Sequence, residues 1–176
     1  MQTFSLALAA TLAAAAVASA ADAAKSVKAE LKNAAGGSVG QVTVTEAPNG
    51  VLLRIEAKGL PPGWHGLHFH DKGDCSKSDF TSAGAHVHAK PVVVHGLLNP
   101  EATEAGDLPN LFVAADGTAT VELFSNYVSL SSGRRPALAD VDGSALVVHA
   151  SPDDYATQPI GGAGARIACA VIPAGD

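Results

Sequence analysis

The amino-acid sequence predicts an all-β fold of about eight short strands, arranged as a Greek-key sandwich or barrel. Apolar and polar residues alternate in short segments, and turn residues separate these segments from one another. After the N-terminal twenty residues, no amphipathic stretch is long enough to indicate a helix. The expected strands cover residues 27–31, 41–45, 51–58, 66–70, 111–115, 118–124, 145–149 and 165–172.

Two dipeptides between the expected strands favour tight hairpin turns. Asn49-Gly50 and Asp116-Gly117 both tolerate the positive φ angles that two-residue hairpin loops require. Each dipeptide therefore predicts an antiparallel pair formed by the strands on either side of it.

The length of 176 residues and the supply of Val, Leu, Ile and Ala suit one domain with a sizeable core. Two connections, residues 71–110 and 150–164, are long for a small β domain. Long loops on a rigid scaffold usually carry function, so we expect the site to involve these two segments.

The chain carries a net charge of −6 and has no cluster of Lys and Arg. A nucleic-acid partner needs a basic stripe that grips phosphates, so this class of function is excluded. We therefore expect a small-molecule partner.

The first twenty residues have the pattern of a cleavable secretory signal. An apolar run over residues 6–18 ends on Ala18-Ser19-Ala20, an A-x-A pattern that signal peptidase cuts. No Lys or Arg precedes the run, and a transmembrane anchor is the alternative, although it needs about 20 strongly apolar residues. We expect a signal peptide at residues 1–20 and a domain at residues 21–176 that is periplasmic or secreted, without membrane association after cleavage.

The sequence holds two cysteines, Cys75 and Cys169. In an exported domain an even pair favours a disulfide, and two buried free thiols are the alternative. A bridge would close a loop that spans most of the domain, worth about 4 to 5 kcal/mol in the chain-entropy model.

All seven histidines fall within residues 65–149. On an extended strand His68 and His70 point to one face, and His65 points to the other. Two imidazoles on one face indicate a metal site rather than a histidine-rich surface, because the loop that follows supplies more histidines. These are His86, His88 and His95. Imidazole suits copper and zinc, and the spacing alone does not choose between them.

A set of short motifs occurs along the chain in a fixed order. They are Gly66-Leu67-His68-Phe69-His70, Gly73-Asp74-Cys75, Ser82-Ala83-Gly84-Ala85-His86, His95-Gly96, Gly106-Asp107-Leu108-Pro109, Leu146-Val147-Val148-His149 and Gly164-Ala165-Arg166-Ile167-Ala168-Cys169. Each motif is weak alone, but the ordered set makes residues 27–173 resemble the bacterial copper-zinc superoxide dismutases. The resemblance implies a Greek-key sandwich whose two long connections are a metal-binding loop and an electrostatic loop.

The resemblance also implies two sets of metal ligands, which share the imidazolate of His86. The implied copper ligands are His68, His70, His86 and His149. The implied zinc ligands are His86, His95 and Asp107.

Further positions match the family outside the ligand sets. Asp153 matches the carboxylate that links a copper histidine to a zinc histidine, with an ordinary loop carboxylate as the alternative. Arg166 matches the active-site arginine, with a surface charge as the alternative. Cys75 and Cys169 match the disulfide within the subunit.

One family zinc ligand is replaced in this chain. A third histidine is expected three residues before Asp107, and Glu104 stands there instead. Glu104 could bind zinc through oxygen, His88 could supply the missing imidazole, or the zinc site could be weak or empty. His88 shares parity with His86 on an extended segment, and a solvated loop histidine is the alternative.

The resemblance implies that superoxide is converted to dioxygen and hydrogen peroxide by copper redox cycling. Arg166 would guide the anionic substrate, and His86 would take up a proton and deliver it to the product. The competing hypothesis is a non-enzymatic periplasmic copper carrier on the same fold. Arg166 and Asp153 argue against a carrier, which needs neither a substrate guide nor a linking carboxylate. A homodimer stays open, because oligomeric state varies in this family.

Overall fold

The computed structural model describes residues 24–131 and 133–175, so the signal peptide expected at residues 1–20 lies outside the described residues. The strands are β1 (Ser26–Asn33), β2 (Ser38–Ala47), β3 (Gly50–Lys58), β4 (Gly63–His65), β5 (Leu67–His70), β6 (Leu111–Val113), β7 (Thr118–Ser125), β8 (Ser144–His149) and β9 (Arg166–Ile172). A single 3-10 turn, η1 (Thr81–Ala83), is the only helical element in this part of the chain. The all-β expectation is confirmed, and each of the eight expected strands overlaps an observed strand.

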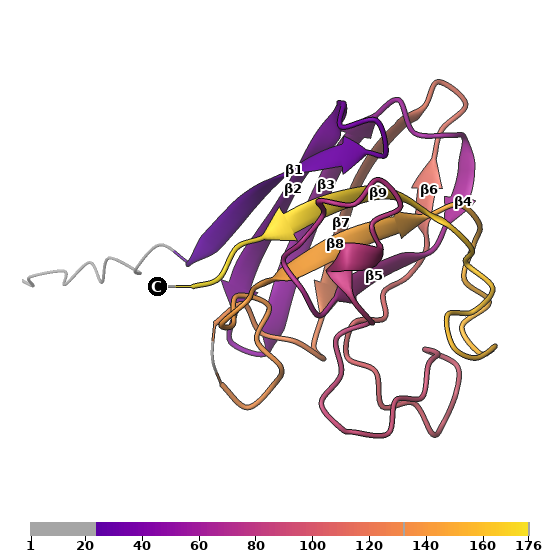
Figure 1. The fold of residues 1–176 in the computed structure, drawn as a ribbon. Coiled ribbons are helices and arrows are strands. Elements are labelled where there is room, and N and C mark those ends of the chain that lie inside the picture. The colour runs from indigo at the N-terminus through magenta and orange to yellow at the C-terminus, as the bar shows by residue number, and fades with distance from the viewer. Residues whose placement is uncertain (1–23, 132, 176) are drawn as a thin grey trace, which may run out of the picture.

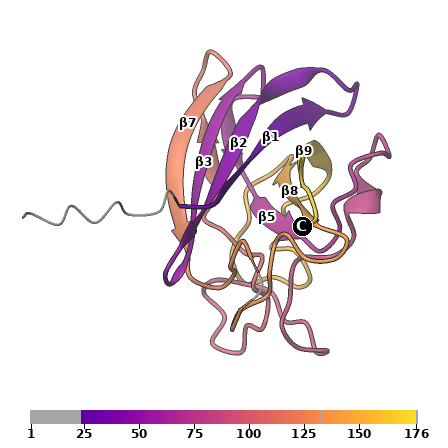
Figure 2. The same cartoon turned by 90° about the vertical axis from the view of Figure 1, so that its left-hand side faces the viewer.

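Seven of the strands form one antiparallel sheet in the order β5-β8-β9-β1-β2-β3-β7. The sheet curls until β1, β2, β3 and β7 form one wall and β5, β8 and β9 form the other (Figures 1 and 2). Strand β9, the last strand of the chain, pairs with the first strand, β1. Such a long-range connection is typical of Greek-key folds. The short pair β4-β6 joins the two edges, because β4 leads into β5 and β6 precedes β7.

The core lies between the two walls and follows directly from the alternation in the sequence. Along β3 buried and exposed residues alternate, and the inward side chains include Leu53 and Ile55. In contrast, every residue of β5 and β8 is buried, because loops cover the outer face of these two strands. Polar side chains on β5 and β8 are therefore held in a rigid, dry setting.

The two expected hairpins have different outcomes. Asn49-Gly50 joins β2 to β3, which pair from Ala47 and Gly50 onward, as predicted. Asp116-Gly117 forms a tight turn, since the Ala114 N–H donates to the Thr118 carbonyl at 2.8 Å. The predicted pairing across this turn is wrong, because β6 pairs with β4 while β7 pairs with β3.

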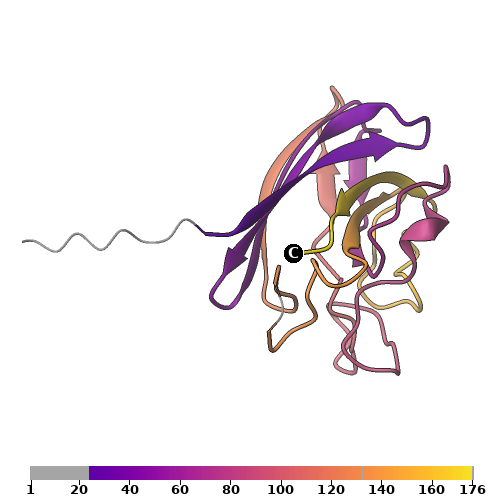
Figure 3. The same cartoon turned by 60° about the vertical axis from the view of Figure 1, so that its left-hand side comes forward.

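Two other features were not predicted. Strand β4 has three residues, Gly63 to His65, too few to show an alternating pattern. A third long connection, residues 126–143, joins β7 to β8. Figure 3 shows it at the same end of the sheet as the outer part of loop 71–110.

The predicted disulfide is present, because Cys75 and Cys169 are bonded at 2.01 Å. It ties the start of the long loop 71–110 to strand β9. Among the described residues, no helix is both long and apolar enough to cross a bilayer.

Candidate metal centre

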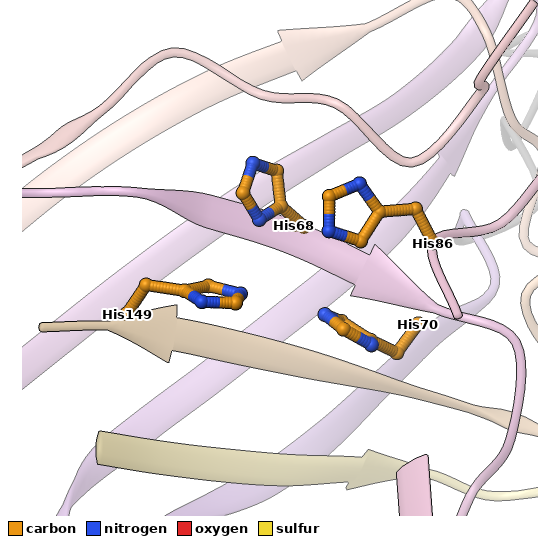
Figure 4. A group of neighbouring side chains, drawn as sticks. All are labelled: His68, His70, His86 and His149. Atoms are coloured by element: carbon orange, nitrogen blue, oxygen red, sulfur yellow. The ribbon is translucent and has the colours of Figure 1, made fainter. Parts of the chain in front are cut away.

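Four buried imidazoles converge beside strand β5 (Figure 4). His68 and His70 lie on β5, and His149 ends β8, which pairs with β5. His86 comes from the long loop, where an isolated bridge sets it opposite His70. His68 and His70, predicted to point to the same face of the strand, therefore belong to one cluster of four imidazoles.

One ring nitrogen on each of these histidines has no hydrogen-bond partner among the described residues. These buried atoms are His68 Nδ1, His70 Nε2, His86 Nε2 and His149 Nε2. A buried polar atom left without a partner costs about 1–3 kcal/mol. Four such atoms in one place are explained if all four bind one shared ion. A metal ion that prefers imidazole, as copper does, fits this donor set.

The second ring nitrogen of each histidine on the two strands is held by the protein. His70 Nδ1 donates to the Gly84 carbonyl and His149 Nδ1 donates to the Gly164 carbonyl, both at 3.0 Å. His68 Nε2 lies 2.8 Å from Asp153 Oδ2. Such bonds fix the tautomer and aim the free lone pair at the metal position.

Burial and the neighbouring charges keep these imidazoles neutral. Desolvation, with the nearby His86 and Arg166, lowers the pKa of His70 to about 2. Desolvation, with His68, His86 and Arg166 nearby, lowers the pKa of His149 to about 3. Both rings therefore carry free lone pairs at neutral pH, as metal ligands must.

Two carboxylates and two imidazoles form a second group next to the first. Glu104 Oε2 lies 2.8 Å from Nδ1 of His86 and 2.8 Å from Nδ1 of His95. Asp107 Oδ1 lies 3.2 Å and 3.1 Å from the same two nitrogens. Four ligands around a tetrahedral zinc ion would lie about 3.3 Å apart, so this donor set fits zinc.

His68 also belongs to a group of close ligand atoms with His86, His95 and Asp107. Its ring stacks on that of His86, with the centroids 3.9 Å apart. Its Nε2 is already bonded to Asp153, and its Nδ1 is one of the four unpartnered nitrogens, so we assign His68 to the first group. Glu104 then completes the second group.

His86 faces both groups through different atoms. Its Nε2 points to the first group, and its Nδ1 lies against Asp107 and Glu104. Burial alone would lower its pKa, but the hydrogen bonds to Asp107 and Glu104 outweigh burial and raise the pKa of His86. For His95 the carboxylates similarly outweigh burial and raise the pKa to about 11.

The Asp153 carboxylate connects the two groups through hydrogen bonds to one histidine of each group. Its Oδ2 lies 2.8 Å from His68 Nε2, and its Oδ1 lies 3.0 Å from His95 Nε2. Asn110 holds the Asp153 backbone with two hydrogen bonds, and the Tyr155 N–H donates to Oδ1 at 2.6 Å. A side chain at Gly161 would overlap this carboxylate, so only glycine leaves room for it.

Asn110, Tyr155 and Gly161 could not be predicted as site residues from sequence. Asn110 reaches Asp153 from another loop. Tyr155 and Gly161 lie in the same loop as Asp153 and act through a backbone N–H and the absence of a side chain, neither of which a residue-type pattern indicates. The neighbouring Asp154 is exposed and caps a turn at Thr157 instead.

Arg166 lies at the start of β9, beside the first group. Its guanidinium donates to the carbonyls of Phe80 at 2.6 Å and Gly84 at 2.7 Å. The Gly84 carbonyl also accepts from His70. This one carbonyl therefore links Arg166 to a histidine of the first group. A surface pocket of about 280 Å³ reaches this position and is lined by Asp79, Thr81, Gly164, Ala165 and Arg166.

Two histidines lie outside both groups. The His65 ring bonds to the carbonyls of His149 and Pro61, each at 2.8 Å, which braces β4 against β8. His88 donates from Nδ1 to the His86 carbonyl at 2.9 Å and lines a different pocket with Asp71 and Arg134. The His88 ring thus lies apart from both groups in this structure.

A curled antiparallel barrel with two adjoining buried ligand groups defines a class of metal-binding β proteins. The family model for copper/zinc superoxide dismutase (SODC) matches residues 38–172, and the chain belongs to this family. A "Superoxide dismutase [Cu-Zn]" of Caulobacter vibrioides is 64% identical over 148 residues, which cover 84% of this chain and 85% of that protein.

Solved structures agree with the family assignment. A double mutant of a SOD-like protein from Bacillus subtilis is 40% identical, with a TM-score of 0.79, over 83% of this chain and 96% of that chain. The Cu/Zn superoxide dismutase from Brucella abortus is 31% identical, with a TM-score of 0.68, over 84% of this chain and 99% of that chain.

Proposed function

We propose that this chain is a superoxide dismutase, which converts two superoxide anions and two protons to dioxygen and hydrogen peroxide. The observation that carries the proposal is the set of four buried imidazole nitrogens without partners, next to the guanidinium of Arg166. A donor set of imidazoles suits a redox metal, and a fixed cation beside it suits an anionic substrate.

In this proposal His68, His70, His86 and His149 hold copper. Bound copper would supply the one-electron redox chemistry of the reaction. Burial keeps His68, His70 and His149 neutral, and the carbonyls of Gly84 and Gly164 and the carboxylate of Asp153 hold these three rings in orientation.

In the same proposal zinc would be held by His86, His95, Asp107 and Glu104. The Glu104 carboxylate supplies the ligand that a histidine supplies elsewhere in the family, and its contacts with both imidazoles support this role. The resulting set of two nitrogen and two oxygen donors is one that zinc accepts in proteins.

His86 and Arg166 act directly on the substrate in this scheme. His86 Nε2 would hold a proton only while it is not bound to copper, and would deliver that proton to the reduced oxygen species, with Nδ1 held by Glu104 and Asp107. Arg166 binds the superoxide anion through its guanidinium, which hydrogen bonds to Phe80 and Gly84 hold in place. Both are catalytic residues.

Export remains part of the proposal, since a disulfide persists in oxidising compartments such as the periplasm. N-terminal sequencing of the mature protein from the periplasmic fraction of a bacterial host checks it. A start near residue 21 is expected, and an intact Met1 in the cytoplasm contradicts it.

The test of function is superoxide consumption by the protein loaded with copper and zinc, measured by stopped-flow absorbance. Turnover that requires bound copper is expected, with free copper removed by a chelator as the control. Stoichiometric copper binding without any turnover would contradict the proposal and favour a copper carrier.

A further inference from the structure

We infer that zinc reaches and leaves its site through a surface pocket of its own, with Glu104 as the ligand that detaches first. This inference rests on the proposed zinc ligands. It concerns metal exchange, which the dismutation reaction does not require.

The carboxylate pocket, as we name it, is a hollow of about 380 Å³ between the two limbs of loop 86–107. The residues of its lining that matter here are Ala89, Lys90, Ala102, Glu104, Asp107 and Tyr127. One water needs only about 10–15 Å³ of such space, so a hydrated cation has room to enter. Two of the proposed zinc ligands thus form part of its wall.

The charges of this pocket select for a cation. Two acidic residues, Glu104 and Asp107, and one basic residue, Lys90, line it, and the two acidic side chains are 4% and 3% exposed. The pocket beside Arg166 shares no lining residue with the carboxylate pocket. The anionic substrate and the zinc ion therefore approach the centre from separate openings.

The ligands differ in how firmly the protein holds them. Asp107 Oδ2 accepts from the Gly96 N–H at 2.8 Å, in addition to the contacts of Oδ1 with the two imidazoles. The His95 ring is held at its other nitrogen by Asp153. Glu104 meets the imidazoles through Oε2, at the end of a side chain with three rotatable bonds.

The Glu104 backbone stays fixed while this side chain turns. Its N–H donates to the Val94 carbonyl at 3.2 Å, and the next N–H, of Ala105, donates to Val87 at 2.8 Å. The carboxylate can swing into the adjoining pocket and carry the cation without any change in the fold. A histidine side chain has two rotatable bonds, one fewer than glutamate, so Glu104 has more freedom to detach than a histidine at this position.

The test follows exchange of bound zinc for isotopically labelled zinc in the copper- and zinc-loaded protein, by mass spectrometry. Ala89→Leu and Ala102→Leu narrow the pocket from two sides at exposed positions, where a larger side chain leaves the core untouched. Ala35→Leu, on the exposed turn between β1 and β2, is the matched control.

We expect several-fold slower zinc exchange in both pocket variants, an unchanged rate in Ala35→Leu, and copper retained in all. Glu104→His should slow exchange as well. Zinc bound at one equivalent that exchanges at the same rate in every variant overturns the route alone. Zinc below one equivalent in the unaltered protein overturns the proposed zinc ligands together with the route.

Discussion

Glu104 Oε2 lies 2.8 Å from Nδ1 of His95, a contact that joins two limbs of the long loop through a buried carboxylate. The same oxygen lies equally close to His86. Glu104 thus lies within hydrogen-bond distance of two of the proposed zinc ligands, although its residue type differs from the family pattern. Three of the following predictions depend on the arrangement of charges around this contact.

Glu104→Ala should weaken zinc binding and leave copper binding unchanged. We expect a loss of at least about 10- to 100-fold in zinc affinity, the size of effect seen even when an outer partner of a ligand is removed. Competition with a zinc chelator measures the affinity. His88→Ala is the matched control, because His88 lies outside both groups. If His88→Ala weakens zinc binding more than Glu104→Ala, the ligand assignment is wrong.

Zinc uptake should release protons at neutral pH, and copper uptake at His70 and His149 should not. The carboxylates raise the pKa of His95 to about 11, so this ring is protonated in the metal-free protein and zinc must displace its proton. Burial lowers the pKa of His70 to about 2 and of His149 to about 3, so these rings are already neutral. On acidification zinc should leave before copper. Calorimetry in buffers of different ionisation enthalpy counts the protons, and equal release for both metals would contradict this account.

The same pKa shifts predict how the stability of the metal-free protein depends on pH. The raised pKa of His95 stabilises the metal-free fold below the unfolded value near 6.5, and this contribution is lost as pH rises through about 11. Hydrogen bonds to His68 and His95 outweigh burial and lower the pKa of Asp153, so its contribution is lost as pH falls into the acid range. Urea midpoints of the metal-free protein should therefore fall at both extremes of pH. A midpoint that stays constant from neutral to strongly alkaline pH would be inconsistent with the charged His95.

Much of the fold could be predicted because its information is local. Alternation in β3 and the Asn49-Gly50 turn are short-range signals, and both lead to the observed β2-β3 pair. The pairing of β6 could not be read from the Asp116-Gly117 turn, because the choice between β4 and β7 is made by how the two edges of the sheet meet. Tertiary context decides where a local turn signal does not.

The candidate site divides in the same way. The pair His68 and His70 follows from strand periodicity, and ordered motifs supply the other histidines. The contacts of the Glu104 side chain could not be predicted from sequence, because its contact with His86 depends on how loop segments 86–88 and 104–107 pair. The sequence therefore leaves three outcomes open at this position, and binding through the Glu104 carboxylate is the one that we propose.

Arg166→Glu should lower superoxide turnover by about 10- to 1,000-fold, the range over which a local field changes association with a charged substrate. The substitution replaces a cation beside His70 with an anion, so it repels superoxide while the four copper ligands remain. Copper content, measured by metal analysis, should be unchanged. Arg166→Lys keeps the charge and should retain more activity than Arg166→Glu. Equal turnover in all three proteins would remove Arg166 from the proposed mechanism.

Loss of the disulfide should destabilise the protein without altering its ligands. The bond joins Cys75 and Cys169 across 94 residues, and the chain-entropy model gives about 4 to 5 kcal/mol for a loop of that length. The paired change Cys75→Ala and Cys169→Ala should lower the free energy of unfolding of the metal-free protein by that amount. Urea denaturation measures it, with Ala35→Leu as a surface control. A change below about 1 kcal/mol, within the spread reported for disulfides, would mean that the bond adds little here.

Asp153→Asn should weaken copper and zinc binding together, because one carboxylate orients a ligand of each metal. Its oxygens bond to Nε2 of His68 and of His95, and an amide offers only one acceptor oxygen for these two ring nitrogens. We expect a loss of about 10- to 100-fold in affinity for each metal. Asp154→Asn is the matched control, since the exposed Asp154 carboxylate caps a turn. Affinity for each metal is measured by chelator competition, and the copper electron paramagnetic resonance spectrum should change only in Asp153→Asn. Equal affinities in the two variants would show that Asp153 is an ordinary loop carboxylate.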